Sequence, residues 1–396
     1  MRILLLNDYG GPVGGAEIEM LALRRALRAR GHEATLLSSS AAPGGVLSEA
    51  DRTCFGTTSP LRTLLQSANP WAWRAVRRAV RELRPDVVHL RLFLTQLSPL
   101  VLRALRDVPT LYEAVWYRSI CPLGTKLLPD GSECRSHWGR VCLTGGCLPR
   151  RDWVPLQAQM RLFRRWSTNL DLIVADSEHV RARLEADGVH ASVVLWHGVR
   201  PPRVTSSLAE HPTVAFAGRL VREKGVDVLL HAFALVRATC PDARLLVAGD
   251  GPERAGLEEL AARLGVRSSV EFLGLVPHAD LDARLAGAWA QVAPSVWQEP
   301  FGIVVAEAMM RGTAVIASAA GGLKEIVDHG RTGLLVPPGD VTALTDALGQ
   351  VLSSRDGARR LGAAASEYAA THLAEDVRVE RLVDLYGELA QRGGRT

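Results

Sequence analysis

Residues 213–251 read TVAFAGRLVREKGVDVLLHAFALVRATCPDARLLVAGDG, and this stretch decides the fold class. It opens and closes with short apolar runs that end in glycine, at 213–218 and 243–249. Between them, residues 226–238 carry the apolar spacing of a helix. Two strands separated by a helix predict a βαβ unit, because parallel strands need a long crossover between them.

The alternation of strands and helices continues along most of the chain. Further strands are predicted at 270–274, 290–295, 313–318 and 334–337, and in the first half at 2–7, 33–38, 86–90, 109–113, 171–176 and 192–196. Helices of the first half are predicted near 16–30, 71–84, 96–106 and 177–187. The pattern favours an α/β protein with two doubly wound parallel-sheet, Rossmann-like domains in tandem.

The domain boundaries follow from changes in this rhythm. Residues 1–196 form the predicted N-terminal domain, with an insertion at 118–165 that holds four of the six cysteines and eight arginines. A linker rich in Pro, Ser and His is expected at 197–212, a second domain at 213–371, and a C-terminal helix at 372–396.

Composition bounds the function classes. A chain of 396 residues is too long for a single ordinary hydrophobic core and fits two domains. Its net charge of +5 is too small to indicate nucleic-acid binding, so no nucleic-acid partner is expected. No run of 18 apolar residues predicts a transmembrane helix. The opening MRILLLNDYG is typical of a buried strand rather than a signal peptide, so we expect a cytoplasmic protein with reduced cysteines or metal-bound ones.

The loop GRLVREKG at 218–225 follows a predicted strand and precedes a helix. Arg219 and Lys224 are therefore expected at the carboxyl edge of the sheet, where an anionic ligand would bind. A guanidinium fork and a mobile ammonium suit two adjoining phosphates. A solvated basic loop is the alternative interpretation.

The stretch EPFGIVVAE at 299–307 combines a helix start with two carboxylates. Pro300 suits the first helical turn, and the amides of Gly302, Ile303 and Val304 would be free donors at the positive end of a helix dipole. Glu299 is placed to accept hydrogen bonds from sugar hydroxyls, or else to cap the helix. Glu307 lies among apolar residues, which favours a buried and partnered carboxylate over a surface one.

Five motifs occur together: GGAE at 14–17, GRL…EKG at 218–225, GDGP at 249–252, EPFG…E at 299–307 and GG…E…GLLVPPGD at 321–340. In their order and spacing they resemble the retaining glycosyltransferases of family 4. The resemblance implies the GT-B fold, in which two Rossmann-like domains face each other across a cleft, and a C-terminal helix that crosses back to the first domain. The second domain would take a nucleotide-sugar donor, and the first would take the acceptor.

The resemblance also implies roles for individual residues. Glu299, Arg219 and Lys224 would be the catalytic set, with the two cations on the donor diphosphate and Glu299 on the transferred sugar. Glu307 would bind the ribose, and the loop at Gly14 and Gly15 would close over the phosphates. The remaining donor-binding residues would be Gly249, Asp250, Gly251, Phe301, Gly302, Ile303 and Val304.

The reaction that the resemblance implies moves a sugar to an acceptor hydroxyl of a glycan, a lipid-linked intermediate or a natural product. It would retain the anomeric configuration by attack on the same face and would need no metal or other cofactor, since cations and a helix dipole stabilise the departing diphosphate. Another GT-B activity, such as a nucleotide-sugar epimerase or a phosphorylase, and a non-catalytic nucleotide-sugar-binding protein remain alternatives. A Rossmann dehydrogenase is disfavoured, because GGPVGGAE does not fit its glycine fingerprint.

The first domain departs from the family pattern. A histidine is usual where this chain has TLYEAVWYRSICP, with Tyr112 and Glu113 in its place. Glu17, His89 and Glu113 are the acceptor-side candidates, although a packed structural role is the favoured interpretation of His89.

Two further features carry expectations of their own. Cys121, Cys134, Cys142 and Cys147 predict a structural zinc, with free thiols or an oxidised pair as the alternatives. The helix at 71–84 carries arginines opposite Trp73, Val76 and Val80, and it could rest peripherally on the inner membrane surface. A core-facing helix with a solvated basic face is the alternative.

Overall fold

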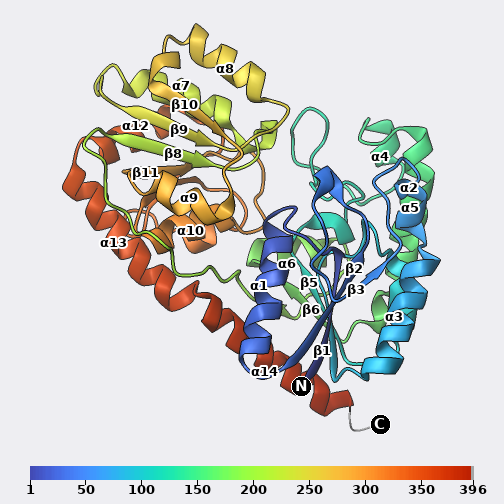
Figure 1. Cartoon of the computed structure of the whole chain (residues 1–396). Coiled ribbons are helices and arrows are strands. Elements are labelled where there is room, and N and C mark those ends of the chain that lie inside the picture. The colour runs from blue at the N-terminus through green and yellow to red at the C-terminus, as the bar shows by residue number, and fades with distance from the viewer. Residues whose placement is uncertain (394–396) are drawn as a thin grey trace. The chain divides into compact units, whose positions relative to one another are not determined.

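The computed structural model describes residues 1–393, which divide into two compact units. The first unit comprises residues 1–196 together with the chain from Arg378 onward, and the second comprises residues 197–377. Figure 1 labels the helices and strands of both units. Among the described residues, no helix is both long enough and apolar enough to span a membrane.

The first unit is built on a seven-stranded sheet in the order β3-β2-β1-β4-β5-β6-β7. Every strand pairing in it is parallel. The strands are β1 (Arg2–Tyr9), β2 (Glu33–Ser39), β3 (Arg52–Cys54), β4 (Val87–Leu90), β5 (Thr110–Ala114), β6 (Leu172–Ala175) and β7 (Val193–Val194). The strand order reverses between β1 and β4, as in a dinucleotide-binding sheet.

Helices of the first unit cover this sheet. They are α1 (Gly15–Ala29), α2 (Arg62–Ser67), α3 (Pro70–Leu83), α4 (Val141–Thr144), α5 (Arg150–Trp166) and α6 (Glu178–Ala186), with short 3-10 turns η1 (Pro43–Gly45), η2 (Pro99–Ala104), η3 (Tyr117–Ser119) and η4 (Ser167–Asn169). The C-terminal helix α14 (Glu375–Gly393) runs beside β1 (Figure 1). It contributes Val379, Leu382, Leu385, Tyr386 and Leu389 to the same apolar core as Ile3 and Leu5.

The second unit repeats the topology with six strands, in the order β10-β9-β8-β11-β12-β13, again all parallel. Its strands are β8 (Thr213–Ala217), β9 (Arg244–Ala248), β10 (Val270–Gly274), β11 (Ala290–Ala293), β12 (Ala314–Ser318) and β13 (Leu334–Val336). Its helices are α7 (Val226–Val236), α8 (Arg254–Arg263), α9 (His278–Leu285), α10 (Ile303–Arg311), α11 (Leu323–Ile326), α12 (Val341–Leu352) and α13 (Arg355–His372), with the 3-10 turns η5 (Arg222–Lys224) and η6 (Arg267–Ser269). The prediction of two doubly wound sheets is confirmed.

Some elements differ from the sequence-based expectation. The helix predicted at 96–106 is only the short 3-10 turn η2, preceded by Ser98 at φ 71°. The insertion at 118–165 contains much of the 17-residue helix α5, which shows no clear apolar period because Gln157 and Gln159 lie on its buried face. The strand β3 and the helix α2 were also missed.

The segment expected as a linker packs against the second unit. The amides of Ser206 and Ser207 donate to the carbonyl oxygens of Arg311 and Ala286, at 2.8 and 2.9 Å. Leu208 lies in the apolar core of that unit. Residues 197–212 are therefore counted with the second unit.

Candidate active site

Two loops of the second unit meet where the strand order of its sheet reverses. β8 pairs with β9 on one side and with β11 on the other, so the chain leaves β8 and β11 at the same carboxyl edge. Ligands of doubly wound sheets bind in the crevice at this reversal. The loop after β8 carries Lys224, and the loop after β11 carries Glu299.

Gly225 lets these two loops touch. Its φ is 66°, and a Cβ atom there would lie 2.1 Å from the carbonyl oxygen of Pro294. Glycine alone combines easy access to this backbone conformation with the absence of a side chain. The contact is closed by the amide of Val296, which donates to the carbonyl oxygen of Glu223 at 3.0 Å.

Lys224 and Glu299 form an ion pair at this point. Nζ of Lys224 donates to Oε1 of Glu299 at 2.5 Å, and the hydroxyl of Ser295 donates to the same oxygen at 2.6 Å. Burial alone would raise the pKa of Glu299, but the charge of Lys224 and the hydrogen bonds from Lys224, Ser295 and Trp297 together outweigh burial, so the pKa lies below its usual value. Glu299 is therefore ionised at neutral pH, and it can orient a cation or accept hydrogen bonds but cannot supply a proton.

Helix α10 begins just after this pair. Its N-cap is Gly302, at φ 107°. Among the described residues, no acceptor is assigned to the amides of Gly302, Ile303 and Val304. Such first-turn amides, at the positive end of the helix dipole, form a ready anion site.

Two details of this helix start could not be read from the sequence. Pro300 lies two residues before the N-cap rather than in the first turn, because the chain turns at Gly302 before helical dihedrals begin. The side chain of Phe301 is buried, with its ring edge-on to His197 at a centroid distance of 5.0 Å. Phe301 therefore supports the turn from within the unit, and its contact with a donor stays a prediction.

Glu307 lies one to two turns along α10 and is partly buried, as expected. Its Oε1 atom contacts Nε2 of His278, the first residue of α9, at 2.7 Å. The hydrogen bond to Glu307 raises the pKa of His278, against the opposing effect of burial. His278 was not among the predicted site residues.

The other donor-side residues lie on the same sheet edge. Arg219 leaves the loop after β8 with its side chain 73% exposed, 3.8 Å from Glu223. It makes no ion pair with Glu299 among those assigned in the described residues. The loop of Gly249, Asp250 and Gly251 follows β9 and is joined to the first loop by the amide of Leu220, which donates to the carbonyl oxygen of Asp250 at 2.9 Å.

In the first unit, the predicted loop of Gly14 and Gly15 forms the start of α1. Gly14 is the N-cap and Gly15 the first helical residue. Glu17 is buried, and its carboxylate accepts hydrogen bonds from the amides of Gly14 and of Glu17 itself. Burial, with a smaller contribution from the charge of Asp8, raises the pKa of Glu17. Glu17 thus closes the helix start, as in one half of a capping box.

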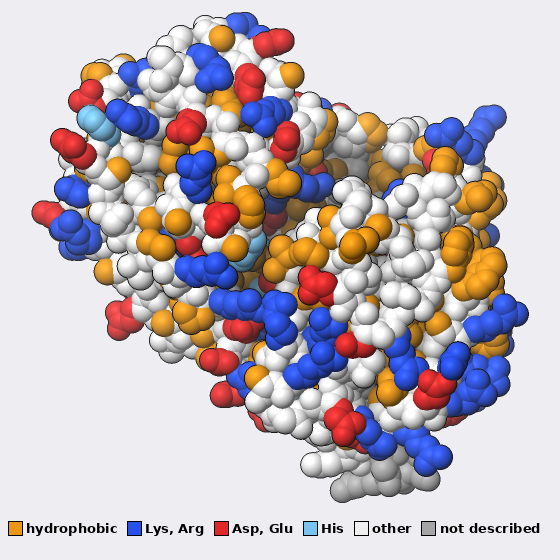
Figure 2. Space-filling model, viewed as in Figure 1, with side chains coloured by type: hydrophobic (Ala, Val, Ile, Leu, Met, Phe, Trp, Pro, Cys, Tyr) orange, Lys and Arg blue, Asp and Glu red, His pale blue; other side chains and the backbone are white. Residues whose placement is uncertain are grey.

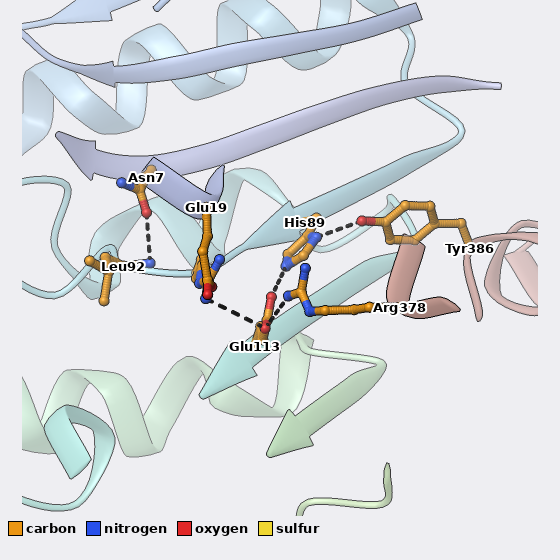
Figure 3. Close-up of polar contacts among 8 residues, drawn as sticks. Asn7, Glu19, His89, Leu92, Glu113, Arg378 and Tyr386 are labelled. Carbon is orange, nitrogen blue, oxygen red and sulfur yellow. Dashed lines mark hydrogen bonds and ion pairs between the residues drawn. The ribbon is translucent and has the colours of Figure 1, made fainter. Parts of the chain in front are cut away.

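His89 and Glu113 belong to a buried polar cluster (Figure 3). Nε2 of His89 contacts Glu113 at 3.1 Å, and Nδ1 contacts the hydroxyl of Tyr386 on α14 at 2.6 Å. Burial lowers the pKa of His89, which matches a neutral ring that donates to Glu113 and accepts from Tyr386. Figure 3 shows both rings and the carboxylate turned toward one another.

Two arginines hold the charge of Glu113. Arg378 of α14 donates to its Oε1 at 2.5 Å, and Arg91 lies 3.9 Å away and pairs with Glu19 of α1. Burial opposes ionisation, but the two guanidinium groups keep the pKa of Glu113 well below its usual value. The contacts of His89 and Glu113 are thus explained by holding α14 in the first unit, in line with the structural role favoured for His89. Both side chains are fully buried, and their acceptor-side role stays a prediction.

The four clustered cysteines are free thiols in the structure. They are close enough for the charges of Cys121 and Cys134 to raise the pKa of Cys142, behind the larger effect of burial. In the described chain, however, no three of the four sulfur atoms lie within 4.8 Å of one another. The structural zinc therefore remains a proposal, which metal analysis of the purified protein tests: one equivalent of zinc would support it, and its absence would favour free thiols.

The sequence identifies the site residues themselves better than the residues that contact them. His278 lies 29 residues before Glu307 in an ordinary helix, and Ser295 follows a strand without any motif. Arg378 and Tyr386 come from the far end of the chain. No local sequence pattern marks these residues. The available signal is that a buried carboxylate, such as Glu113, requires a cationic partner somewhere in the chain.

Known proteins share both halves of this arrangement. The model of the glycosyl transferase 4-like domain matches residues 14–199, and that of the glycosyl transferases group 1 matches residues 203–368. Glycogen synthase of Mycobacterium tuberculosis is 29% identical, over 93% of this chain and 90% of its own. The GDP-mannose-dependent alpha-(1-6)-phosphatidylinositol monomannoside mannosyltransferase of the same species is 32% identical, over 71% and 77%.

Solved structures agree with this result. Sucrose-phosphate synthase from Thermosynechococcus elongatus superposes with a TM-score of 0.75 and 25% identity, over 98% of this chain and 99% of that one. The two doubly wound sheets and the Lys224–Glu299 pair, where the strand order of the second sheet reverses, agree with these relatives. The chain belongs to the family 4 glycosyltransferases of GT-B fold.

Proposed function

We propose that this glycosyltransferase moves a sugar from a nucleoside diphosphate sugar to an acceptor hydroxyl, with retention of the anomeric configuration and without a catalytic metal ion. The observation that carries the proposal is the Lys224–Glu299 ion pair beside the start of α10. Lys224 and the backbone amides of residues 302–304, to which no acceptor is assigned among the described residues, lie at the same edge of the second unit's sheet.

The proposed donor site separates the two charges of the reaction. Breaking the bond between the anomeric carbon and the phosphate oxygen leaves negative charge on the diphosphate and positive charge on the sugar. Lys224 and the amides of Gly302 and Ile303 would stabilise the diphosphate, as preorganised donors do for a developing anion. The ionised Glu299 would hold Lys224 and accept hydrogen bonds from the sugar hydroxyls.

Arg219 and Glu307 would complete the site after small movements. The exposed side chain of Arg219 is free to move onto a bound diphosphate, because Glu223, at 3.8 Å, is the one ion-pair partner that it has within residues 1–393. Glu307 would exchange its contact with His278 for the ribose hydroxyls, as acidic residues do in other doubly wound nucleotide sites. Neither step needs a metal ion to neutralise charge.

Retention would follow if the acceptor hydroxyl attacks the face that the diphosphate leaves, while a phosphate oxygen takes the acceptor's proton. Glu299 is engaged by Lys224 and Ser295, which disfavours its use as a covalent nucleophile. The first unit would take the acceptor. A lipid-linked acceptor is favoured by the similarity to a mannosyltransferase whose name specifies a phosphatidylinositol substrate.

Donor binding is tested by titrating GDP-mannose, UDP-glucose and ADP-glucose while following thermal unfolding. A donor at 100 times its dissociation constant should add about 2.7 kcal/mol to the free energy of unfolding. Lys224→Ala and Arg219→Ala should weaken kcat/KM by about 10²–10³. Arg263→Ala removes an exposed cation from α8 and serves as the matched control, with activity unchanged.

The outcomes separate the alternatives. If no donor shifts the unfolding transition, the donor site is wrong. Donor binding without transfer to any acceptor would favour a nucleotide-sugar-binding protein, and conversion of the donor itself would favour an epimerase. Activity that survives chelation, with a product of unchanged anomeric configuration by NMR, would support the mechanism, and loss on chelation restored by a divalent cation would refute it.

A further inference from the structure

The first unit exposes large apolar side chains on neighbouring elements. Phe55 and Trp71 are 48% and 49% exposed, and their rings lie 5.2 Å apart. Leu61 and Leu64 are 65% and 61% exposed, and Val154 is 62% exposed. These five residues are called the α2–α3 patch below. Half-exposed aromatic rings that touch, next to exposed leucines, mark an interaction surface rather than scattered surface residues.

The elements that carry the patch are held together by hydrogen bonds. The hydroxyl of Ser67, the last residue of α2, donates to the carbonyl oxygen of Pro155 in α5 at 2.5 Å. The side chain of Asn69 caps α3 by accepting from the amides of Trp71 and Ala72, and it donates to the carbonyl oxygen of Phe55 at 2.9 Å. Figure 2 shows hydrophobic side chains gathered along the edge of the first unit where Figure 1 labels α2, α5 and α3.

Arginines surround the patch with little acidic compensation. Residues 55–81 contain five arginines and no acidic residue. On α3, helical spacing puts Arg74, Arg78 and Arg81 on the same outward face as Trp71, opposite the buried Ala72 and Val76. Of these three, Arg78 alone forms an ion pair, with Glu82, in the part of the chain that the structure describes. Figure 2 shows Lys and Arg side chains, in blue, beside the hydrophobic ones along this edge of the first unit.

We infer that the α2–α3 patch docks onto a membrane surface that contains anionic lipids. Tryptophan and leucine side chains enter the headgroup region, and arginines beside them bind lipid phosphates while their stems cover apolar surface. A second copy of this chain would bring the same arginines together and be repelled. A nucleic acid would leave the exposed leucines without a partner.

The docking is independent of the proposed transfer reaction, because its residues lie outside the donor site. Where the acceptor is lipid-linked, a point that rests on the proposed function, docking would bring the first unit to that acceptor. The presence of the patch is thus explained by recruitment rather than by catalysis.

Co-sedimentation with vesicles tests the inference. The full chain should bind vesicles of phosphatidylcholine mixed with an equal amount of phosphatidylglycerol, and should bind pure phosphatidylcholine far less. Arg74→Gln/Arg81→Gln should lower binding to the anionic vesicles by about 25-fold, since each arginine near the surface contributes about fivefold. Leu64→Gln/Trp71→Gln should lower it by at least about tenfold.

Matched controls lie in the second unit. Arg244→Gln/Arg360→Gln removes the same charge, and Leu235→Gln/Leu275→Gln removes exposed leucines, of which Leu235 is 55% and Leu275 83% exposed. These controls should bind vesicles like the parent, and all variants should keep the parent's melting temperature and its affinity for a nucleotide-sugar donor. Equal binding by patch and control variants would overturn the inference. So would a self-associating parent that ignores vesicles and becomes monomeric in the patch variants.

Discussion

Replacing Arg378 by methionine should destabilise the first unit strongly. Arg378 is buried and donates to the fully buried Glu113 at 2.5 Å, so its loss leaves the carboxylate with the neutral ring of His89 at 3.1 Å and the guanidinium of Arg91 at 3.9 Å. Removing one partner of a buried ion pair costs about 3–5 kcal/mol, and the remaining guanidinium favours the lower end. For a unit of this size, a loss of about 3 kcal/mol lowers the melting temperature by about 6–12 °C.

Thermal unfolding of the variant at neutral pH measures this effect, with Arg381→Met as the control. Arg381 lies one turn further along α14, is half exposed, and approaches Glu388 at 3.8 Å, so its replacement should change stability by less than about 1 kcal/mol. The double variant Glu113→Gln/Arg378→Met removes both charges and should recover part of the loss.

The pH dependence provides a second test. The pKa of Glu113 is depressed in the folded chain, so ionised Glu113 stabilises the fold at pH values above the ordinary glutamate pKa. This stabilisation is lost as the pH falls through the folded pKa. In Arg378→Met the folded pKa rises, so acid unfolding should begin at a higher pH. Arg378→Met and Arg381→Met variants that unfold alike at every pH would refute the assignment of this cluster as the anchor of α14.

Three further predictions concern the second unit. Glu299→Gln should lower kcat/KM by more than about tenfold while thermal unfolding stays near that of the parent, because Lys224 keeps partial access to water. Gly225→Ala should lower stability and donor affinity well beyond Gly265→Ala, since both have positive φ but only Gly225 would place its Cβ against a carbonyl oxygen; equal losses would contradict the steric reasoning. The pKa of His278 is raised in the folded chain by its hydrogen bond to Glu307, so this pairing stabilises the fold fully below the ordinary histidine pKa. The stabilisation is lost as the pH rises through the folded pKa. The melting temperature of His278→Gln should therefore differ from that of the parent at pH 6 but not at pH 9.

The sequence predicts most strands of the two sheets because each of them carries its own signal, whereas the three-residue strand β3 does not. Runs such as TVAFA and RLLVA are apolar on both faces, which a buried parallel strand requires, and glycine ends them. The positions of Lys224 and Glu299 follow from these strands, since loops at the carboxyl edge of one sheet must approach each other.

What the sequence does not predict depends on partners far away in the chain. Tyr386 lies 297 residues from His89, and nothing in HLAEDVRVERLVDLYGELAQR indicates which of its arginines is buried. Arg378 and Arg381 look equivalent as letters, yet one faces a buried carboxylate and the other faces solvent. α5 was missed for a different reason: glutamines on its buried face hide the apolar period.

The two units share one strand order, but their sheet edges differ in the charge that they can accept. In the first unit, the start of α1 is closed by Glu17, and Asp8 beside it is fully buried, with its carboxylate accepting the amides of Thr95, Gln96 and Leu97. A diphosphate would meet carboxylates and occupied amides there. In the second unit, the loop after the corresponding strand carries Arg219 and Lys224, and α10 begins with amides to which no acceptor is assigned. This difference in charge supports our proposal that the anionic donor binds at the second sheet rather than at the first.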